Sequence, residues 1–290
     1  MTAWQAGRFR IDLSRPRVMG IVNITPDSFS DGGAHATTAL AIAQCERLVA
    51  EGADLLDLGG ESTRPGAAAV GLDEERARVL PVLQHALRLG VPVSVDTRRR
   101  ALMQQALHAG ADIINDVNAL RDDGAEALLA VHPTAGVCLM HMRGEPATMQ
   151  QAPHYDDVVE EVAQFLAGRA ASLQACGMAA ERIVLDPGFG FGKTDAHQVA
   201  LHRALPRLQA LGFPVLVGWS RKSTLGRITG RPVHERLPAS LAAALAAVQQ
   251  GARLLRVHDV AATVDALKVW QALQGDPAGP PSSFARQSPA

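Results

Sequence analysis

The sequence predicts a (β/α)8 barrel with its active site at the C-terminal ends of the strands, and three observations lead to this prediction. Eight short apolar runs recur along the chain, with helical patterns between them. Glycine stands at corresponding positions where several of the helices should end. Polar residues follow the runs, at the end of the strands where barrel enzymes place their active sites. An open doubly wound sheet is the alternative, but no dinucleotide-binding fingerprint supports it.

The eight predicted strands are rich in Val, Ile and Leu, as expected of strands that are buried on both faces. In chain order they cover residues 18–23, 55–59, 93–96, 113–116, 137–141, 183–186, 215–218 and 254–258. Helical spacing is clear between them, in segments 38–50, 74–89, 156–176 and 237–250. Strand and helix in alternation predict a parallel sheet covered by helices.

The junctions between helices and strands repeat one pattern. Gly52, Gly110 and Gly251 occur in the strings EGAD, AGAD and QGAR, and Gly90 and Gly212 occur in LGVPV and LGFPV. Glycine adopts the left-handed conformation that ends a helix without the penalty of a Cβ atom. We therefore expect helices to end at these glycines, directly before the next strand.

Composition excludes several classes of protein. The chain has 290 residues, of which 47% are hydrophobic, and its net charge is -1, so a disordered or nucleic-acid-coating protein is disfavoured. No apolar window is long enough to cross a membrane, and residues 1–17 lack the apolar core of a secretory signal. Cys45, Cys138 and Cys176 are widely separated among apolar neighbours, which predicts buried free thiols in a reducing, cytoplasmic compartment.

Length alone suggests two domains, yet a barrel of this kind uses about 250 residues as one. We predict an N-terminal extension over residues 1–17 and a barrel over 18–274. Residues 275–290 are rich in Pro and Ser and are predicted to be disordered.

Three predicted loops carry residues suited to binding a ligand. Residues 23–33 form a polar loop that is long for a strand-to-helix connection, although a solvated surface loop is the alternative. Residues 59–66 combine glycines, hydroxyls and an arginine, a composition that suits a phosphate-type anion. Residues 186–193 place glycine at alternate positions, and Phe189 or Phe191 is positioned to cover a planar ligand. The last loop is not a Walker motif, because Lys193 lacks the required helix start.

These strings resemble the dihydropteroate synthase family. NITPDSFSDGG, DLGGESTRPG, SVDT, IIND, LMHMRGEPATMQ, DPGFGFGK, SRKS, ERLPASLAAA and RVHDVAATVDALKV are similar to that family's signatures in order and spacing. The resemblance covers about residues 18–273. Pterin-dependent methyltransferases, and a non-catalytic pterin-binding paralogue, are the alternatives. A methyltransferase is not expected to carry ESTRPG with SRKS and RVHD.

The resemblance implies a condensation in folate biosynthesis. The family joins 6-hydroxymethyl-7,8-dihydropterin diphosphate to 4-aminobenzoate and releases 7,8-dihydropteroate and diphosphate in the presence of Mg²⁺. The implied mechanism is a dissociative substitution, in which diphosphate leaves and the amine captures a delocalised cation. No nucleophilic side chain is required, so the protein acts by positioning and by stabilising charge.

The resemblance also implies the site residues. The pterin is expected to bind Asp96, Asn115, Asp186 and Lys222. The diphosphate is expected to bind Asn23, Thr63, Arg64, Arg256 and His258, and Mg²⁺ is expected near Asn23 and Asp27, since this ion prefers oxygen ligands. The 4-aminobenzoate slot is expected to comprise Thr63, Pro65, Phe191, Lys222 and Ser223, with Phe29 closing over it. Asn23, Arg64, Lys222, Arg256 and His258 are the expected catalytic residues.

Further expectations follow from the resemblance. Sulfonamides should compete with 4-aminobenzoate. Replacing Arg64 or Arg256 by Ala should slow turnover far more than it weakens pterin binding. Arg98, Arg99 and Arg100 follow SVDT where the family often has Lys-Pro, and we expect little effect on the chemistry, because they begin a helix beyond the site. A homodimer is expected, with the helix over residues 237–248 as a candidate interface. Burial of that helix within one barrel is an equal alternative.

Overall fold

A computed structural model describes residues 1–25, 33–62, 66 and 70–274. Its central feature is an eight-stranded parallel sheet in the order β8-β7-β6-β5-β4-β3-β10-β9. A bridge between Leu185 and Val215 joins the two edges, so the sheet is closed as a barrel. The strands are β3 (Arg17–Asn23), β4 (Leu55–Gly59), β5 (Val93–Asp96), β6 (Ile113–Asp116), β7 (Gly136–Met140), β8 (Ile183–Asp186), β9 (Leu216–Val217) and β10 (Leu254–Val257). The predicted fold class is confirmed.

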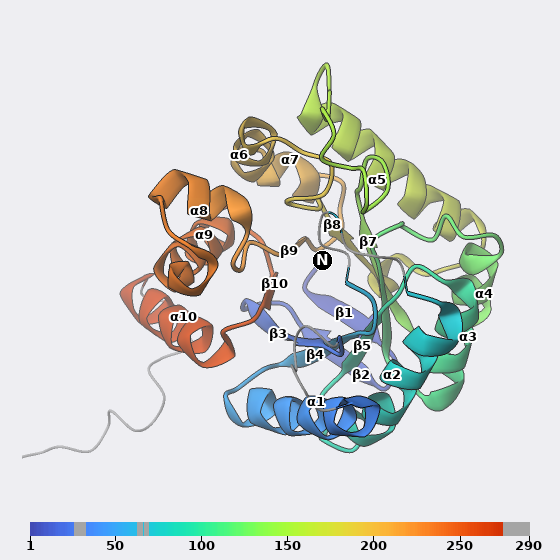
Figure 1. The fold of residues 1–290 in the computed structure, drawn as a ribbon. Helices are drawn as coiled ribbons and strands as arrows, with labels where there is room; N and C mark the ends of the chain where they lie inside the picture. Colours follow the sequence, from blue (N-terminus) through green and yellow to red (C-terminus); the bar gives the residue numbers. More distant parts are fainter. Residues whose placement is uncertain (26–32, 63–65, 67–69, 275–290) are drawn as a thin grey trace, which may run out of the picture.

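Helices surround the sheet, as Figure 1 shows. They are α1 (Gly33–Ala50), α2 (Leu72–Ala86), α3 (Arg100–Ala109), α4 (Ala125–Val131), α5 (Val158–Ala175), α6 (Asp195–Arg203), α7 (Leu205–Gln209), α8 (Ser223–Thr229), α9 (Leu237–Gln249) and α10 (Val260–Gln274), with short 3-10 turns η2 (Ala180–Arg182) and η3 (Val233–Glu235). Gly110 ends α3 with a φ of 104°, which is the left-handed conformation predicted for it.

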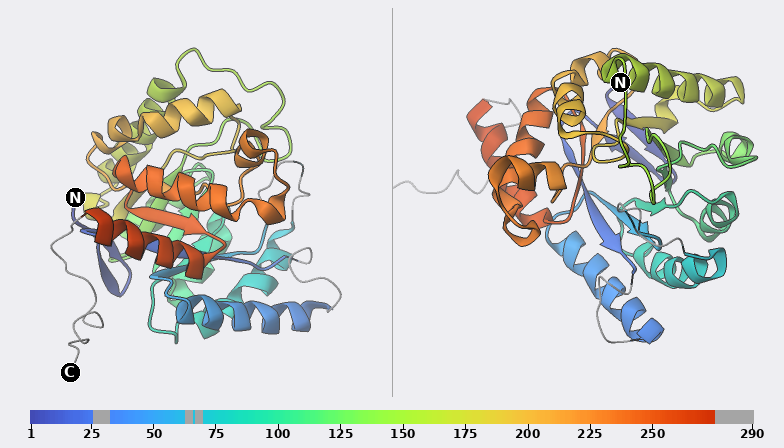
Figure 2. Two further views of the ribbon diagram at one scale, coloured as in Figure 1. Left: turned by 90° about the vertical axis from the view of Figure 1, so that its left-hand side faces the viewer. Right: turned by 45° about the horizontal axis from the view of Figure 1, so that its top comes forward.

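The end of the barrel where the strands begin is closed by side chains and by a hairpin. Residues 1–17 include β1 (Ala3–Ala6) and β2 (Phe9–Asp12), which pair in antiparallel fashion. The Trp4 indole is buried and donates a hydrogen bond to the carbonyl of Arg182 at 3.0 Å. It packs in one cluster with inward-facing side chains such as Met19 and Leu55. The left view of Figure 2 shows the hairpin at this end. We call the opposite end, where the strands finish, the open end of the barrel.

The structure tests the prediction that the three cysteines are buried free thiols. Cys45 and Cys138 are buried free thiols as predicted, but the prediction for Cys176 is wrong. Cys176 is exposed because it lies at the C-cap of α5, one residue beyond the helix. Among the described residues, no helix has the length and apolar character needed to cross a membrane. The division into extension, barrel and tail stays a prediction, and residues 275–290 lie outside the described residues.

Candidate active site

Charged side chains from β4, β5 and β10 meet at the open end of the barrel. Arg256 Nε donates to Asp57 Oδ2 at 2.6 Å, and Arg256 Nη2 donates to Asp96 Oδ2 at 2.9 Å. Asn115 on β6 donates through Nδ2 to the same Asp57 oxygen at 3.2 Å. Three of these residues, Asp96, Asn115 and Arg256, are predicted site residues, and the barrel brings them into one hydrogen-bonded group.

Asp57 is the member of this group that the site prediction missed. Its side chain is 0% exposed, and its Oδ1 has no hydrogen-bond partner among the described residues. A buried charge is costly unless it is paired, so the ion pair with Arg256 is what permits a carboxylate here. The signal was present in the sequence, because Asp57 interrupts the otherwise apolar run of β4.

Burial and charge shift the pKa values of this group. Burial raises the pKa of Asp96 to about 8, which Arg256 opposes and the neighbouring Asp57 reinforces. Burial also raises the pKa of Asp186, on β8. For Arg256, burial lowers the pKa, but the attraction of Asp57 and Asp96 outweighs it, so the net pKa is raised. Arg256 therefore stays charged between the two acidic side chains and holds both in place.

The loop after β8 is folded tightly against the segment that follows β7. Gly188 and Gly192 have φ of 69° and 61°, and a Cβ at either would overlap the carbonyl of His141 or of Arg143. These two glycines therefore allow close approach to the chain itself. Gly190 differs, because its hypothetical Cβ would lie 3.2 Å from the side chain of Lys222.

Lys193 anchors this loop from inside. Its Nζ is 2.9 Å from His141 Nδ1 and donates to the carbonyls of His141, Gly188 and Phe191 at 3.0–3.1 Å. Burial lowers the pKa of Lys193 to about 7 and that of His141 to about 2. His141 is therefore neutral. Sequence reasoning excluded a Walker lysine but did not find this structural role.

The structure separates the two phenylalanines of the loop. Phe189 is buried and stacked on Trp219, with ring centroids 4.2 Å apart, so it belongs to the core. Phe191 is only partly buried, and Lys222 Nζ lies 4.5 Å from its ring centroid. Ser223, the first residue of α8, is exposed. Phe191 is therefore the ring placed beside the predicted site lysine.

The segment after β9 is held in an unusual backbone conformation. Arg221 has a φ of 59°, in the left-handed region that non-glycine residues rarely adopt. Its side chain forms an ion pair with Asp259, with Nη2 and Oδ1 2.5 Å apart. Ser220 Oγ, directly before it, accepts from the His258 backbone N–H at 3.1 Å and lies 3.0 Å from His258 Nδ1. The turn thus links His258 to the lysine-bearing loop.

Asn23 ends β3 beside the carboxylates. A Cβ on Gly59 would lie 3.9 Å from Asp96 Oδ2 and 4.0 Å from Asn23 Oδ1, so glycine leaves both oxygens facing a common space. Within the part of the chain that the structure describes, no three His, Cys, Asp or Glu side chains are grouped to hold a metal ion. The predicted site residues Asp27, Thr63, Arg64 and Pro65, and the predicted covering residue Phe29, lie outside the described residues.

Comparisons with known proteins point in one direction. A family profile described as pterin binding enzyme matches residues 19–258. The dihydropteroate synthase of Neisseria meningitidis serogroup B is 58% identical over 276 residues, which cover 93% of this chain and 97% of that protein. The Xanthomonas albilineans dihydropteroate synthase with 4-aminobenzoic acid superposes with a TM-score of 0.89 at 53% identity, covering 95% of this chain and 99% of that one. The synthase of the same organism in complex with 7,8-dihydropteroate gives a TM-score of 0.85 at 47% identity, covering 96% and 100%.

Proposed function

The chain belongs to the dihydropteroate synthases, a family of pterin-binding enzymes, and from this membership we propose how its barrel carries out the family's reaction. The enzyme condenses 6-hydroxymethyl-7,8-dihydropterin diphosphate with 4-aminobenzoate to give 7,8-dihydropteroate and diphosphate. The observation that most directly supports a shared mechanism is the group formed by Asp57, Asp96 and Arg256 at the open end of the barrel.

The pterin ring is proposed to bind Asp96, Asn115, Asp186 and Lys222. A pterin presents an edge of N–H donors like that of a guanidinium, which a carboxylate accepts in bidentate fashion. Asn115 and Asp186 are only 5% and 6% exposed, so their polar atoms are shielded from bulk water. A planar ligand bound there would form hydrogen bonds with these atoms in place of water.

The diphosphate is proposed to bind Asn23, Thr63, Arg64, Arg256 and His258. Arg256 uses Nε and Nη2 for carboxylates, so an anion would meet the guanidinium through its Nη1 side. Mg²⁺ would neutralise charge on the leaving diphosphate, and Asn23 Oδ1 is a suitable hard ligand beside Asp96. Asp27 is proposed as a further oxygen ligand of the ion.

The slot for 4-aminobenzoate is proposed to comprise Thr63, Pro65, Phe191, Lys222 and Ser223. Phe191 provides an aromatic wall and Lys222 a cation for the carboxylate. In the reaction, the bond between the pterin methylene carbon and the diphosphate oxygen breaks, and its electron pair leaves with diphosphate. The amine nitrogen then bonds to the methylene carbon and loses one proton. The residues position both partners and stabilise the departing charge.

A homodimer and a cytoplasmic location complete the proposal. Ile228, Val233 and Leu237 are exposed apolar residues on α8, η3 and α9, which supports an interface that includes the start of the helix singled out in the sequence. One face of that helix packs inward through Ser240 and Ala244. The exposed apolar residues beside it are available to a second copy.

Turnover with the pterin diphosphate, 4-aminobenzoate and Mg²⁺ tests this function. Dihydropteroate and diphosphate should form in equal amounts, and omitting 4-aminobenzoate should prevent dihydropteroate formation. A pterin-dependent methyltransferase would release no diphosphate. A non-catalytic paralogue would bind the pterin without turnover. Either outcome would overturn the proposal.

A further inference from the structure

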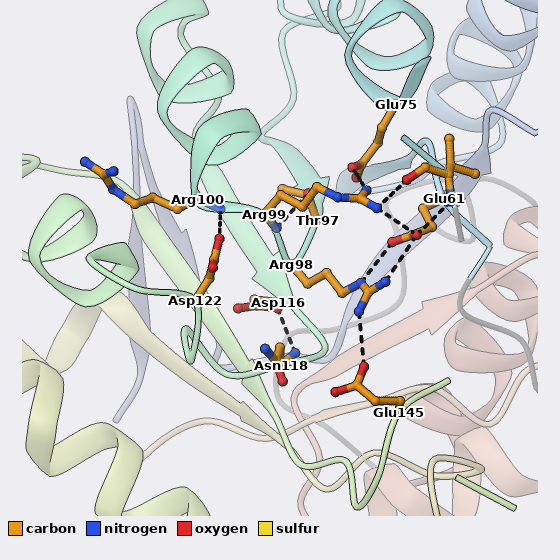
Figure 3. Close-up of polar contacts among 11 residues, drawn as sticks. Glu61, Glu75, Thr97, Arg98, Arg99, Arg100, Asp116, Asn118, Asp122 and Glu145 are labelled. Atoms are coloured by element: carbon orange, nitrogen blue, oxygen red, sulfur yellow. Dashed lines mark hydrogen bonds and ion pairs between the residues drawn. The ribbon is translucent and has the colours of Figure 1, made fainter. Parts of the chain in front are cut away.

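Two of the three consecutive arginines after β5 join the loops at the open end of the barrel. Arg98 Nε donates to Glu61 Oε2 at 3.1 Å, and Arg98 Nη1 donates to Glu145 Oε2 at 3.1 Å. Arg99 Nη2 lies 3.1 Å from Glu61 Oε1, and Arg99 Nη1 pairs with Glu75. Figure 3 shows Arg98 and Arg99 reaching Glu61, with Glu145 and Glu75 on their other sides. We call these five residues the Glu61 cluster.

The Glu61 cluster also brings together the two residues that flank segment 62–69. Val70 donates its backbone N–H to Glu61 Oε1 at 3.1 Å, and its carbonyl accepts from Arg99 Nη2. Glu61 and Val70 therefore meet at the base of segment 62–69, although they are nine positions apart. That segment contains Thr63, Arg64 and Pro65, which we propose to contact the diphosphate and 4-aminobenzoate.

Two of the glutamates that pair with these arginines, Glu61 and Glu75, have buried side chains. The side chain of Glu61 is only 6% exposed. Burial tends to raise its pKa, but hydrogen bonds from Arg98 and Val70 and the charges of both arginines outweigh this and lower the pKa. Glu75 is fully buried and Arg99 is its ion-pair partner. Removing an arginine would leave a buried glutamate without one of its partners, which is costly.

We propose that Arg98 and Arg99 are positioning residues, which act through Glu61 to fix the base of segment 62–69. Fixing the ends of a loop reduces the conformational freedom that is lost when its side chains engage a substrate. Arg98 extends this effect to the segment after β7, because it also binds Glu145. The inference rests on the proposed function of the segment, and it replaces our expectation that these arginines have little effect.

Arg100 provides a matched control. It is the third arginine of the run, and among the described residues its side chain takes part in no ion pair. Its backbone N–H donates to Asp122 Oδ2 at 2.7 Å, a bond that a side-chain substitution leaves in place. Arg100→Met therefore removes a charge from the same run without touching the Glu61 cluster.

The first experiment compares Arg98→Met, Arg99→Lys and Arg100→Met. We expect Arg98→Met and Arg99→Lys to lower kcat/KM for the pterin diphosphate about tenfold. Binding of 6-hydroxymethylpterin, which lacks diphosphate, should change less than about twofold, as should every parameter of Arg100→Met. Arg99→Lys keeps a charge beside Glu75, and a thermal melt checks that it folds. The inference would be overturned if pterin binding fell as much as kcat/KM did. It would also be overturned if kcat/KM fell no more in these two variants than in Arg100→Met.

A double-mutant cycle tests the bridge between loops. Arg98→Met and Glu145→Gln each break the same contact, so the double variant should lose no more activity than Arg98→Met alone. Losses that multiply would show that the two residues act separately and would overturn the bridge. If the wild type and Arg100→Met were both inactive, the proposed function itself would be overturned.

Hydrogen exchange supplies a readout independent of turnover. The Val70 amide should exchange faster in Arg99→Lys than in Arg100→Met, because the Glu61 cluster protects it. Unchanged exchange would contradict a positioning role for Arg99.

Discussion

Arg256 Nε lies 2.6 Å from Asp57 Oδ2, and this pair joins β10 to β4 across 199 positions of sequence. Asp57 is fully buried, so its charge depends on Arg256. The same guanidinium holds Asp96 on the next strand. Asp57 therefore orients the cation that we propose to bind the diphosphate, although we assign no substrate contact to Asp57 itself.

Replacing Asp57 by Asn should impair both stability and turnover. The variant keeps the shape but leaves Arg256 with less compensating charge, so we expect about 3 kcal/mol less unfolding free energy. Loss of a fixed orientation for Arg256 should lower kcat on the order of 100-fold. Ser94→Ala is the control, because the buried Ser94 Oγ has no partner among the described residues. Denaturant unfolding and steady-state kinetics measure both effects, and wild-type kcat in Asp57→Asn would refute the orienting role.

The geometry separates the expected effects of Arg64→Ala and Arg256→Ala. Arg256 lowers the pKa of Asp96, so its loss should raise that pKa further and weaken pterin binding as well as turnover. Arg64→Ala should reduce kcat about 100-fold and leave pterin binding within about twofold. Calorimetry with 6-hydroxymethylpterin distinguishes the variants. If both bind this pterin like the wild type, the contact between Arg256 and Asp96 does not support pterin recognition.

Phe191→Ala should selectively weaken the binding of 4-aminobenzoate. The ring lies beside Lys222, so its removal takes away apolar contact and a cation–π partner. We expect KM for 4-aminobenzoate to rise about tenfold, with a parallel rise in the Ki of a competing sulfonamide. Phe213→Ala, before β9, is the control for loss of an aromatic ring elsewhere. A matching rise in KM for the pterin diphosphate would argue against this assignment, as would sulfonamide inhibition that added 4-aminobenzoate does not relieve.

His141 should make the fold sensitive to acid. Burial lowers its pKa from 6.5 to about 2, so between these values the unfolded state binds more protons than the folded state. The contribution of neutral His141 to the free energy of unfolding is therefore complete above pH 6.5. It declines as the pH falls below this value, by about 1.4 kcal/mol per pH unit. His141→Gln should remove this slope between pH 4.5 and 6, relative to the exposed control His108→Gln. Urea unfolding across this range measures it, and parallel wild-type and His141→Gln profiles would contradict the assignment.

The sequence by itself determined the architecture. Strands β4, β5, β6 and β8 begin and end at the predicted residues, because apolar runs, helical spacing and terminal glycines are local properties of the chain. Polar residues after these runs also located the site, since parallel strands end at one edge of a barrel. Asp96, Asn115 and Arg256 meet there as the pattern predicts.

Only the tertiary structure decided which side chains pair. Asp57 with Arg256, Lys193 with His141, and Arg98 with Glu61 and Glu145 are contacts between distant positions. Phe189 and Phe191 look equivalent in sequence, yet one stacks on Trp219 in the core and the other lies beside Lys222. Such differences depend on how neighbouring strands are staggered and on where each loop directs its side chains. Periodicity specifies the elements, whereas burial and charge pairing act only after the barrel has brought those elements together.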